Sequence, residues 1–184
     1  MEYDPVAESV SALEAGPNGW VQQLNFVVFG LLTIAFAVGL HLGVRRSRAG
    51  IAGPAILVLS GVGLLLAAAL PLREDAAGVT YDPGGHVVAG FTYFLSSGVW
   101  LIVMSRRMAR DPQWRGVATY ALASGITMVG LFLAIGRLVI PEDAPLHPWA
   151  GLAQRVALAV LFPCMIVLGL RLLRLVRAEP GRAP

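Results

Sequence analysis

The sequence contains no lysine, a single cysteine and little charge of either sign. Of its 184 residues, 14% are charged and 57% are hydrophobic, whereas about a quarter of the residues in a typical soluble domain are charged. A soluble chain of this size could not bury so much apolar surface in one core. The lone Cys164 excludes a framework of intrachain disulfides. The composition therefore indicates a membrane protein.

Motifs for several kinds of chemistry are also missing. The sequence has no Gly-x-Ser-x-Gly elbow, no phosphate-binding glycine loop and no dinucleotide fingerprint. It also lacks the close His-x-x-x-His or Cys-x-x-Cys spacing of a metal site. We therefore predict no metal and no cofactor, and the sequence favours a protein that is not an enzyme.

The basic residues are all arginine, and the net charge is +3. A basic balance can indicate nucleic-acid binding. Here the arginines flank long apolar runs, so membrane topology accounts for them and we predict no nucleic-acid partner. Arginine without lysine, in a chain rich in alanine, glycine, leucine and valine, is typical of a GC-rich bacterial genome.

Five apolar runs are long enough to cross a membrane. A helix needs roughly 20 apolar residues to span a ~30 Å hydrocarbon layer, and helices are expected because lipid offers no partner for an open sheet edge. We predict an all-α fold, a polytopic membrane bundle of five transmembrane helices. The predicted spans run from about Trp20 to Leu42, Ala52 to Leu70, Pro83 to Ser105, Gly116 to Ile140 and Pro148 to Leu175.

The polar start of the chain is a separate segment in this prediction. Asp4 followed by Pro5 is typical of a helix start, and the apolar residues that follow share one helical face. We divide the chain into an extracytoplasmic segment with a short interfacial helix (1–19), the transmembrane bundle (20–177) and a cytoplasmic tail (178–184).

The arginines predict the orientation of the bundle. They gather in the first connection, the third connection and the C-terminal tail, and arginine-rich loops stay on the cytoplasmic side. We therefore expect the N-terminus outside, the C-terminus in the cytoplasm and the protein in the cell (inner or plasma) membrane. The arginines concerned are Arg45, Arg46, Arg48, Arg106, Arg107, Arg110, Arg115, Arg171, Arg174, Arg177 and Arg182.

Polar side chains that enter the spans gather near the predicted outer surface. Ionisable groups inside a membrane face the protein interior or water, so several helices that offer polar groups at one depth predict a pocket open to the outside. Within the spans these residues are Gln22, Gln23, Asn25, His86, Arg137, Gln154 and Arg155, and in the adjoining outer segments they are Glu8, Asp82, Glu142 and His147.

Arg155 lies about seven residues into the fifth span, or ~10 Å at 1.5 Å per residue. One interpretation is a structural arginine paired with Asp82, Glu8 or a helix-end carbonyl. The other is an anchor for a carboxylate or lipid phosphate, which a guanidinium binds as a fork. Arg137 is close to Pro141 and can snorkel to the surface. We favour the structural interpretation for both arginines.

His86 stands near the start of the third span, after an Asp82–Pro83 pair that predicts a helix cap. We favour a structural histidine held by hydrogen bonds. The alternatives are a general base and a ligand in a metal site shared with His147 and an acid.

Several short motifs resemble one known family. They are Glu8-Ser9-Val10-Ser11-Ala12-Leu13 and Gly16-Pro17-Asn18-Gly19-Trp20 before the first span, Asp82 with His86 before the third, and Gly151-Leu152-Ala153-Gln154-Arg155 in the fifth. With them the chain resembles, over nearly its whole length, the bacterial and archaeal membrane family catalogued as domain of unknown function nine hundred and ninety-eight.

This resemblance implies a multi-pass fold and no particular activity. It also implies a further helix before the Glu8 segment, so that either this helix precedes the given start or one side of the bundle is open. The positions that match the family's polar motifs are Glu8, Ser11, His86, Gln154 and Arg155.

Three classes of function stay open. The favoured one is a membrane-embedded binding or accessory module for an anionic lipid headgroup or a small anionic ligand, with membrane lipids as partners. The second is an enzyme acting on a lipid or lipid-linked substrate at the outer leaflet, with His86 as base and Arg155 as anion anchor. The third is a small transporter subunit working as an oligomer, since a fold alone does not choose among functions. The candidate ligand-binding residues are Arg155, Gln154, His86, Asp82, Glu8, Ser11, Arg137, Gln23 and Asn25.

Overall fold

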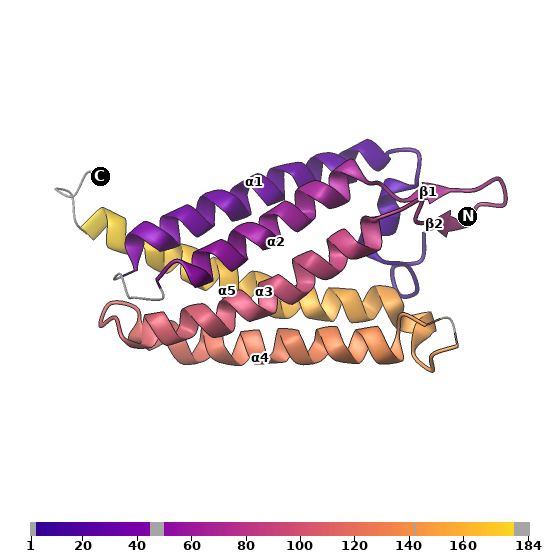
Figure 1. Cartoon of the computed structure of the whole chain (residues 1–184). Helices are drawn as coiled ribbons and strands as arrows, with labels where there is room; N and C mark the ends of the chain where they lie inside the picture. Colours follow the sequence, from indigo (N-terminus) through magenta and orange to yellow (C-terminus); the bar gives the residue numbers. More distant parts are fainter. Residues whose placement is uncertain (1–2, 45–49, 142, 179–184) are drawn as a thin grey trace.

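Five long helices form the bundle in the computed structural model, which describes residues 3–44, 50–141 and 143–178 (Figure 1). All five are long and apolar enough to cross a membrane, which confirms the predicted multi-pass all-α fold. Their ends differ from the predicted ends by a few residues. The helices are α1 (Gly19–Gly43), α2 (Ala52–Ala69), α3 (His86–Ala109), α4 (Arg115–Leu138) and α5 (Ala150–Ala178).

The short elements lie together at one end of the bundle (Figure 1). We call this end, made of residues 3–18, 70–85, 139–141 and 143–149, the N-terminal end. The described part of the C-terminal helix α5 finishes at the opposite end (Figure 1). The short elements are the 3-10 helices η1 (Val10–Glu14) and η2 (His147–Trp149) and the strands β1 (Arg73–Glu74) and β2 (Thr80–Tyr81), which pair antiparallel.

Helix α3 begins later than predicted because a glycine precedes it. Gly85 has a φ of 101°, in the left-handed region that glycine adopts without steric cost, so Pro83 stays in the loop. Asp82 nevertheless caps the helix. Its carboxylate accepts hydrogen bonds from the backbone amides of His86 and Val87 at 3.2 and 2.9 Å, which satisfies two donors that a helix start leaves unpaired.

The N-terminal segment folds as a turn followed by a 3-10 helix. The carboxylate of Asp4 accepts a hydrogen bond from the Val6 amide at 2.8 Å, which makes a turn where the sequence predicted a helix start. Ser9 then caps η1, because its hydroxyl accepts a hydrogen bond from the Ala12 amide at 3.2 Å. The short helix is thus present, but it begins later than Asp4.

Glycines allow the helices to approach closely in the middle of the bundle. A Cβ atom on Gly125 of α4 would lie 2.8 Å from the carbonyl oxygen of Gly98 on α3. A Cβ atom on Gly30 of α1 would lie 2.9 Å from the carbonyl oxygen of Gly61 on α2. Small residues serve this purpose at helix contacts in membranes. The largest buried side chains of the protein include Leu40, Leu57, Trp100, Leu101, Met104, Trp114 and Leu161.

The outward faces of the helices are apolar. Leu32, Val88 and Ile166 are 60%, 67% and 60% exposed, and similar side chains cover much of the remaining outer surface of the spans. Monomeric soluble proteins rarely expose so much contiguous apolar surface. Lipid contact accounts for these faces.

The opposite end of the bundle is held by side chains that bond to loop carbonyls. The buried Arg107 donates hydrogen bonds to the carbonyl oxygens of Val44 and Gly50, and the Trp114 indole donates to that of Gly43 at 2.9 Å. Some predicted loop residues lie outside the described residues, namely Arg45, Arg46, Arg48, Glu142 and Arg182.

Candidate functional site

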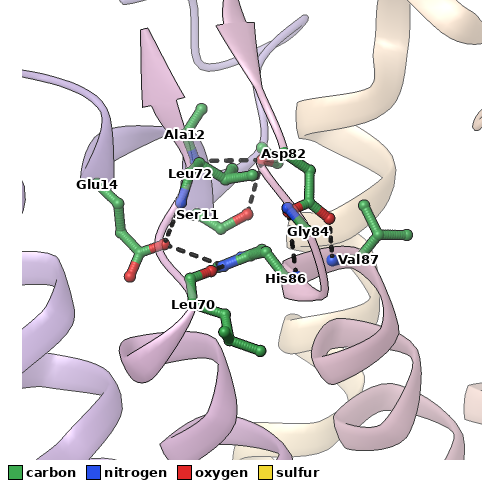
Figure 2. A network of polar contacts seen from close by, with 10 residues as sticks. Ser11, Ala12, Glu14, Leu70, Leu72, Asp82, Gly84, His86 and Val87 are labelled. Carbon is green, nitrogen blue, oxygen red and sulfur yellow. Dashed lines mark hydrogen bonds and ion pairs between the residues drawn. The ribbon is translucent and has the colours of Figure 1, made fainter.

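A buried carboxylate faces a buried imidazole at the N-terminal end of the bundle (Figure 2). Glu14 Oε2 lies 3.2 Å from His86 Nδ1, and the two side chains are 0% and 6% exposed. Glu14 comes from the end of η1 and His86 from the first turn of α3. The contact therefore joins two segments that are far apart in the sequence.

The backbone around Glu14 fixes the position of its carboxylate. A Cβ atom on Gly19 would lie 1.9 Å from the Glu14 carbonyl oxygen, so the tight turn between η1 and α1 requires glycine there. The Leu72 amide donates to Glu14 Oε2 at 3.4 Å. The other oxygen, Oε1, is buried and has no hydrogen-bond partner among the residues that the structure describes.

This environment changes the acidity of Glu14. Burial raises the pKa of the carboxyl from its ordinary value of 4.5 to about 7, against the Leu72 hydrogen bond, which lowers it. Burial disfavours the charged form because a carboxylate loses its hydration. Glu14 therefore changes charge near neutral pH.

His86 is held in one orientation by two acceptors. Its Nδ1 lies 3.0 Å from the carbonyl oxygen of Leu70 as well as 3.2 Å from Glu14. A carbonyl oxygen only accepts hydrogen bonds, so Nδ1 carries the proton. The second ring nitrogen, Nε2, makes no hydrogen bond within the described part of the chain and is not fully buried.

Asp82 stands beside this pair and supports it. Desolvation alone would raise the pKa of its carboxyl, but hydrogen bonds from the amides of Val87, Gly84 and His86, with the charge of His86, lower the pKa below its ordinary value. Asp82 is thus an ionised cap that positions the first turn of α3 and the His86 ring that it carries (Figure 2).

Two cavities meet at His86. They measure about 210 and 150 Å³, several times the roughly 30 Å³ that a water molecule occupies in the liquid. Among the described residues, no aspartate, glutamate or arginine lines either cavity. Their apolar walls include Phe91, Met128, Phe132 and Ile135 in the larger and Phe26, Phe29, Leu158 and Phe162 in the smaller. The residues shared by both are Ser11, His86, Gly90, Phe94 and Gln154.

Gln154 and Ser11 bring hydrogen-bonding groups to the same two cavities as His86. Gln154 Oε1 accepts a hydrogen bond from the Val10 amide at 2.6 Å, which leaves the amide nitrogen of Gln154 free to donate. The Ser11 hydroxyl lies 2.9 Å from the hydroxyl of Ser9. The structure therefore brings together three of the predicted residues at one place.

Arg155 instead holds the N-terminal segment on α5. Its Nη1 donates to the carbonyl oxygens of Pro5 and Glu8 at 2.6 and 3.2 Å, and its Nη2 donates to the Tyr3 hydroxyl at 2.7 Å. It also donates to the Gly151 carbonyl in its own helix. These contacts fit the structural interpretation of this arginine, and Arg155 lines neither cavity.

Of the other candidate ligand-binding residues, only Asn25 also lines one of these two cavities, and the rest lie elsewhere. Glu8 lines a wider hollow of about 490 Å³ between the N-terminal segment and the β1–β2 turn. Asn25 lines the smaller cavity, Gln23 is half-buried on α1 and Arg137 is exposed on α4. The Nδ1 atom of His147 lies 2.9 Å from the Val139 carbonyl oxygen. In the described ranges, no three His, Cys, Asp or Glu side chains are grouped to hold a metal ion.

Sequence reasoning missed Glu14 as a site residue. Glu14 is not among the polar residues from which we predicted the pocket. The signal that could have singled it out is its place directly before the Gly16–Gly19 turn, because a tight turn there folds the acid back toward the end of the bundle.

The comparisons with known proteins give one match. The model of a family described as "Protein of unknown function (DUF998)" matches residues 1–171. This range contains every residue of the site and nearly all of the five helices. Searches of curated proteins and of solved structures found no match.

Proposed function

Because the chain belongs to the DUF998 family, as its motifs predicted, and this family's description names no activity, we propose a function from the geometry. The protein is a membrane-embedded binding module for a lipid-like ligand. One observation carries the proposal: two apolar cavities meet at Ser11, His86 and Gln154. Ligand sites are largely apolar with a few polar groups that fix orientation.

The polar groups of the site indicate what the ligand carries. In the neutral form of His86, with the proton on Nδ1, the ring offers a lone pair at Nε2 that accepts a hydrogen bond. The amide nitrogen of Gln154 donates one, because the oxygen of that side chain is already bonded to Val10. A head that carries both a hydroxyl and a carbonyl group matches this pair.

The charge of the site favours an uncharged head. The sequence led us to expect an anionic headgroup with Arg155 as its anchor. In the structure the Arg155 guanidinium donates to main-chain oxygens and to Tyr3, and no arginine of the described ranges lines either cavity. Burying an unpaired charge is costly, so a neutral lipid suits these walls better than an anion.

We further propose that the N-terminal end faces the outside of the plasma membrane. The acids Glu8, Glu74 and Asp75 lie at this end, while Arg106 and Arg110 close α3 at the other. The side richer in arginine stays in the cytoplasm. The ligand would then reach the cavities from the outer leaflet.

The test is to fill the cavities with a larger side chain. Gly90 lines both, and a Cβ atom there would have no atom within 4 Å, so a Gly90→Leu side chain fits without a backbone clash. Overfilling a packed site costs about 1–3 kcal/mol. We therefore expect the copurified lipid detected by native mass spectrometry to fall about 10-fold or more.

A matched variant controls for the change from glycine to leucine. Gly130 on α4 also has open space around its Cβ position and lines neither cavity. Gly130→Leu should therefore keep the wild-type lipid content. Equal lipid content in wild type and Gly90→Leu, with both proteins folded, would contradict the proposed function.

A further inference from the structure

The Glu14–His86 contact has the arrangement of a catalytic acid–base pair. In such pairs a buried carboxylate accepts the Nδ1–H of a histidine, holds one tautomer and stabilises the imidazolium that forms in the reaction. Here the fully buried Glu14 lies 3.2 Å from Nδ1, and the Leu70 carbonyl at 3.0 Å selects the same tautomer. Nε2 is not among the buried atoms that lack a partner, so this nitrogen keeps accessible surface for a bound molecule.

The cavities supply the remaining parts of a reaction site. Nε2 is the free nitrogen of a ring that lines both cavities, which suits a base acting on a bound molecule. The Gln154 amide nitrogen is a neutral donor on the same walls. A donor of this kind stabilises the negative oxygen that develops when an ester carbonyl is attacked. Ser11 adds a hydroxyl at the same place.

We propose that this protein hydrolyses an uncharged lipid acyl ester, with His86 as general base and Glu14 as its positioning residue. The inference rests on the proposed function, because the lipid must first be bound in the cavities. The uncharged class follows because no aspartate, glutamate or arginine in the part of the chain that the structure describes lines the cavities. The ester follows from the combination of a base and a neutral oxyanion donor.

The reaction needs no reagent besides water. Nε2 of His86 takes a proton from a water molecule while the water oxygen bonds to the ester carbonyl carbon. The resulting oxyanion accepts a hydrogen bond from the Gln154 amide, and ionised Glu14 stabilises the imidazolium. The bond between the carbonyl carbon and the alcohol oxygen then breaks, and the imidazolium returns its proton to that oxygen. The products are a carboxylic acid and an alcohol.

The test uses the purified full-length protein with dioleoylglycerol, and the matched dialkyl ether as a ligand that cannot be hydrolysed. Wild-type protein should bind both lipids and release oleic acid only from the ester. Glu14→Gln keeps the shape of the side chain but cannot carry charge, so kcat should fall on the order of 100-fold or more. Its KM should change less than about threefold, because Glu14 does not line the cavities and its lost interaction with the imidazolium is made only during the reaction.

The outcomes separate catalysis from binding. Binding of the ether without release of oleic acid from the ester would overturn the catalytic proposal and leave the binding function standing. Binding of neither lipid would overturn both. Full activity in folded His86→Ala, or an equal loss in kcat and affinity for Glu14→Gln, would also overturn catalysis. If His86→Ala does not fold, Glu14→Gln decides the question.

Discussion

Replacing Glu14 by glutamine should change how the stability of the protein depends on pH. Burial raises the pKa of this carboxyl from 4.5 to about 7, so the folded protein binds a proton there that the unfolded chain has already released. A raised folded-state pKa contributes stability that is fully present below pH 4.5 and is lost as pH rises through about 7. Glutamine resembles the protonated acid and does not ionise.

The size of the effect follows from the shift in pKa. Each pH unit between 4.5 and about 7 removes up to ~1.4 kcal/mol of the free energy of unfolding, or ~3 kcal/mol in all. This is an upper value, because a charged His86 at 3.2 Å favours the ionised carboxylate. For a chain of this length the loss corresponds to a fall in Tm of roughly 6–12 °C.

Thermal unfolding of both proteins in one detergent, from pH 5 to pH 8 at constant ionic strength, measures this difference. Titrating groups common to both chains cancel when the two are compared. Asp82 does not interfere, since its lowered pKa affects stability only below its ordinary value of 3.8. Glu14→Gln should match wild type near the acid limit and become the more stable protein as pH rises.

Parallel Tm curves for wild type and Glu14→Gln would refute the reasoning, because they would mean that Glu14 has the same pKa in the folded and unfolded states. A Glu14→Gln protein that is less stable at high pH would refute it more strongly. That result would show that the contact with His86 outweighs the cost of burying the carboxylate.

Two further predictions concern the N-terminal segment and the topology. Arg155→Ala removes hydrogen bonds to Pro5 and Tyr3. Amide hydrogen exchange in residues 3–13 should therefore speed up, and the free energy of unfolding should fall by ~1.5–3 kcal/mol. Replacing the exposed Arg137 by alanine should change neither quantity. In the β1–β2 turn, Ala77→Cys should react with a membrane-impermeant maleimide on intact cells, whereas Arg110→Cys should react only after permeabilisation. The reverse labelling pattern would invert the proposed orientation.

The helices could be predicted from the sequence because apolar length decides them. A run of about 20 apolar residues has few stable alternatives in lipid, and all five predicted runs are helices. The ends were less predictable, since they depend on single backbone conformations. The left-handed Gly85 delays α3 beyond Pro83, and the turn at Asp4 delays the first short helix.

The site could be predicted only in part. Polar side chains placed at one depth are visible in the sequence, and the structure brings Ser11, His86 and Gln154 to the same cavities. Glu8 was among the predicted partners of Arg155, although the contact is to its carbonyl oxygen and not to its carboxylate. The bond to the Pro5 carbonyl was not predictable, because Pro5 is about 150 positions away in the sequence. Glu14 was missed for a similar reason: its burial depends on the chain at 70–72 folding back over it.

The choice of an acid at position 14 argues for a role that uses charge. Glutamine has nearly the same shape and could also accept the Leu72 amide and the His86 Nδ1–H. Because glutamine does not ionise, it would avoid most of the loss of up to ~3 kcal/mol in the free energy of unfolding that follows when the buried carboxyl ionises near neutral pH. Residues that lower the stability of the fold in this way concentrate at functional sites. A purely structural contact would favour the neutral side chain, whereas a pair that stabilises an imidazolium requires the carboxylate.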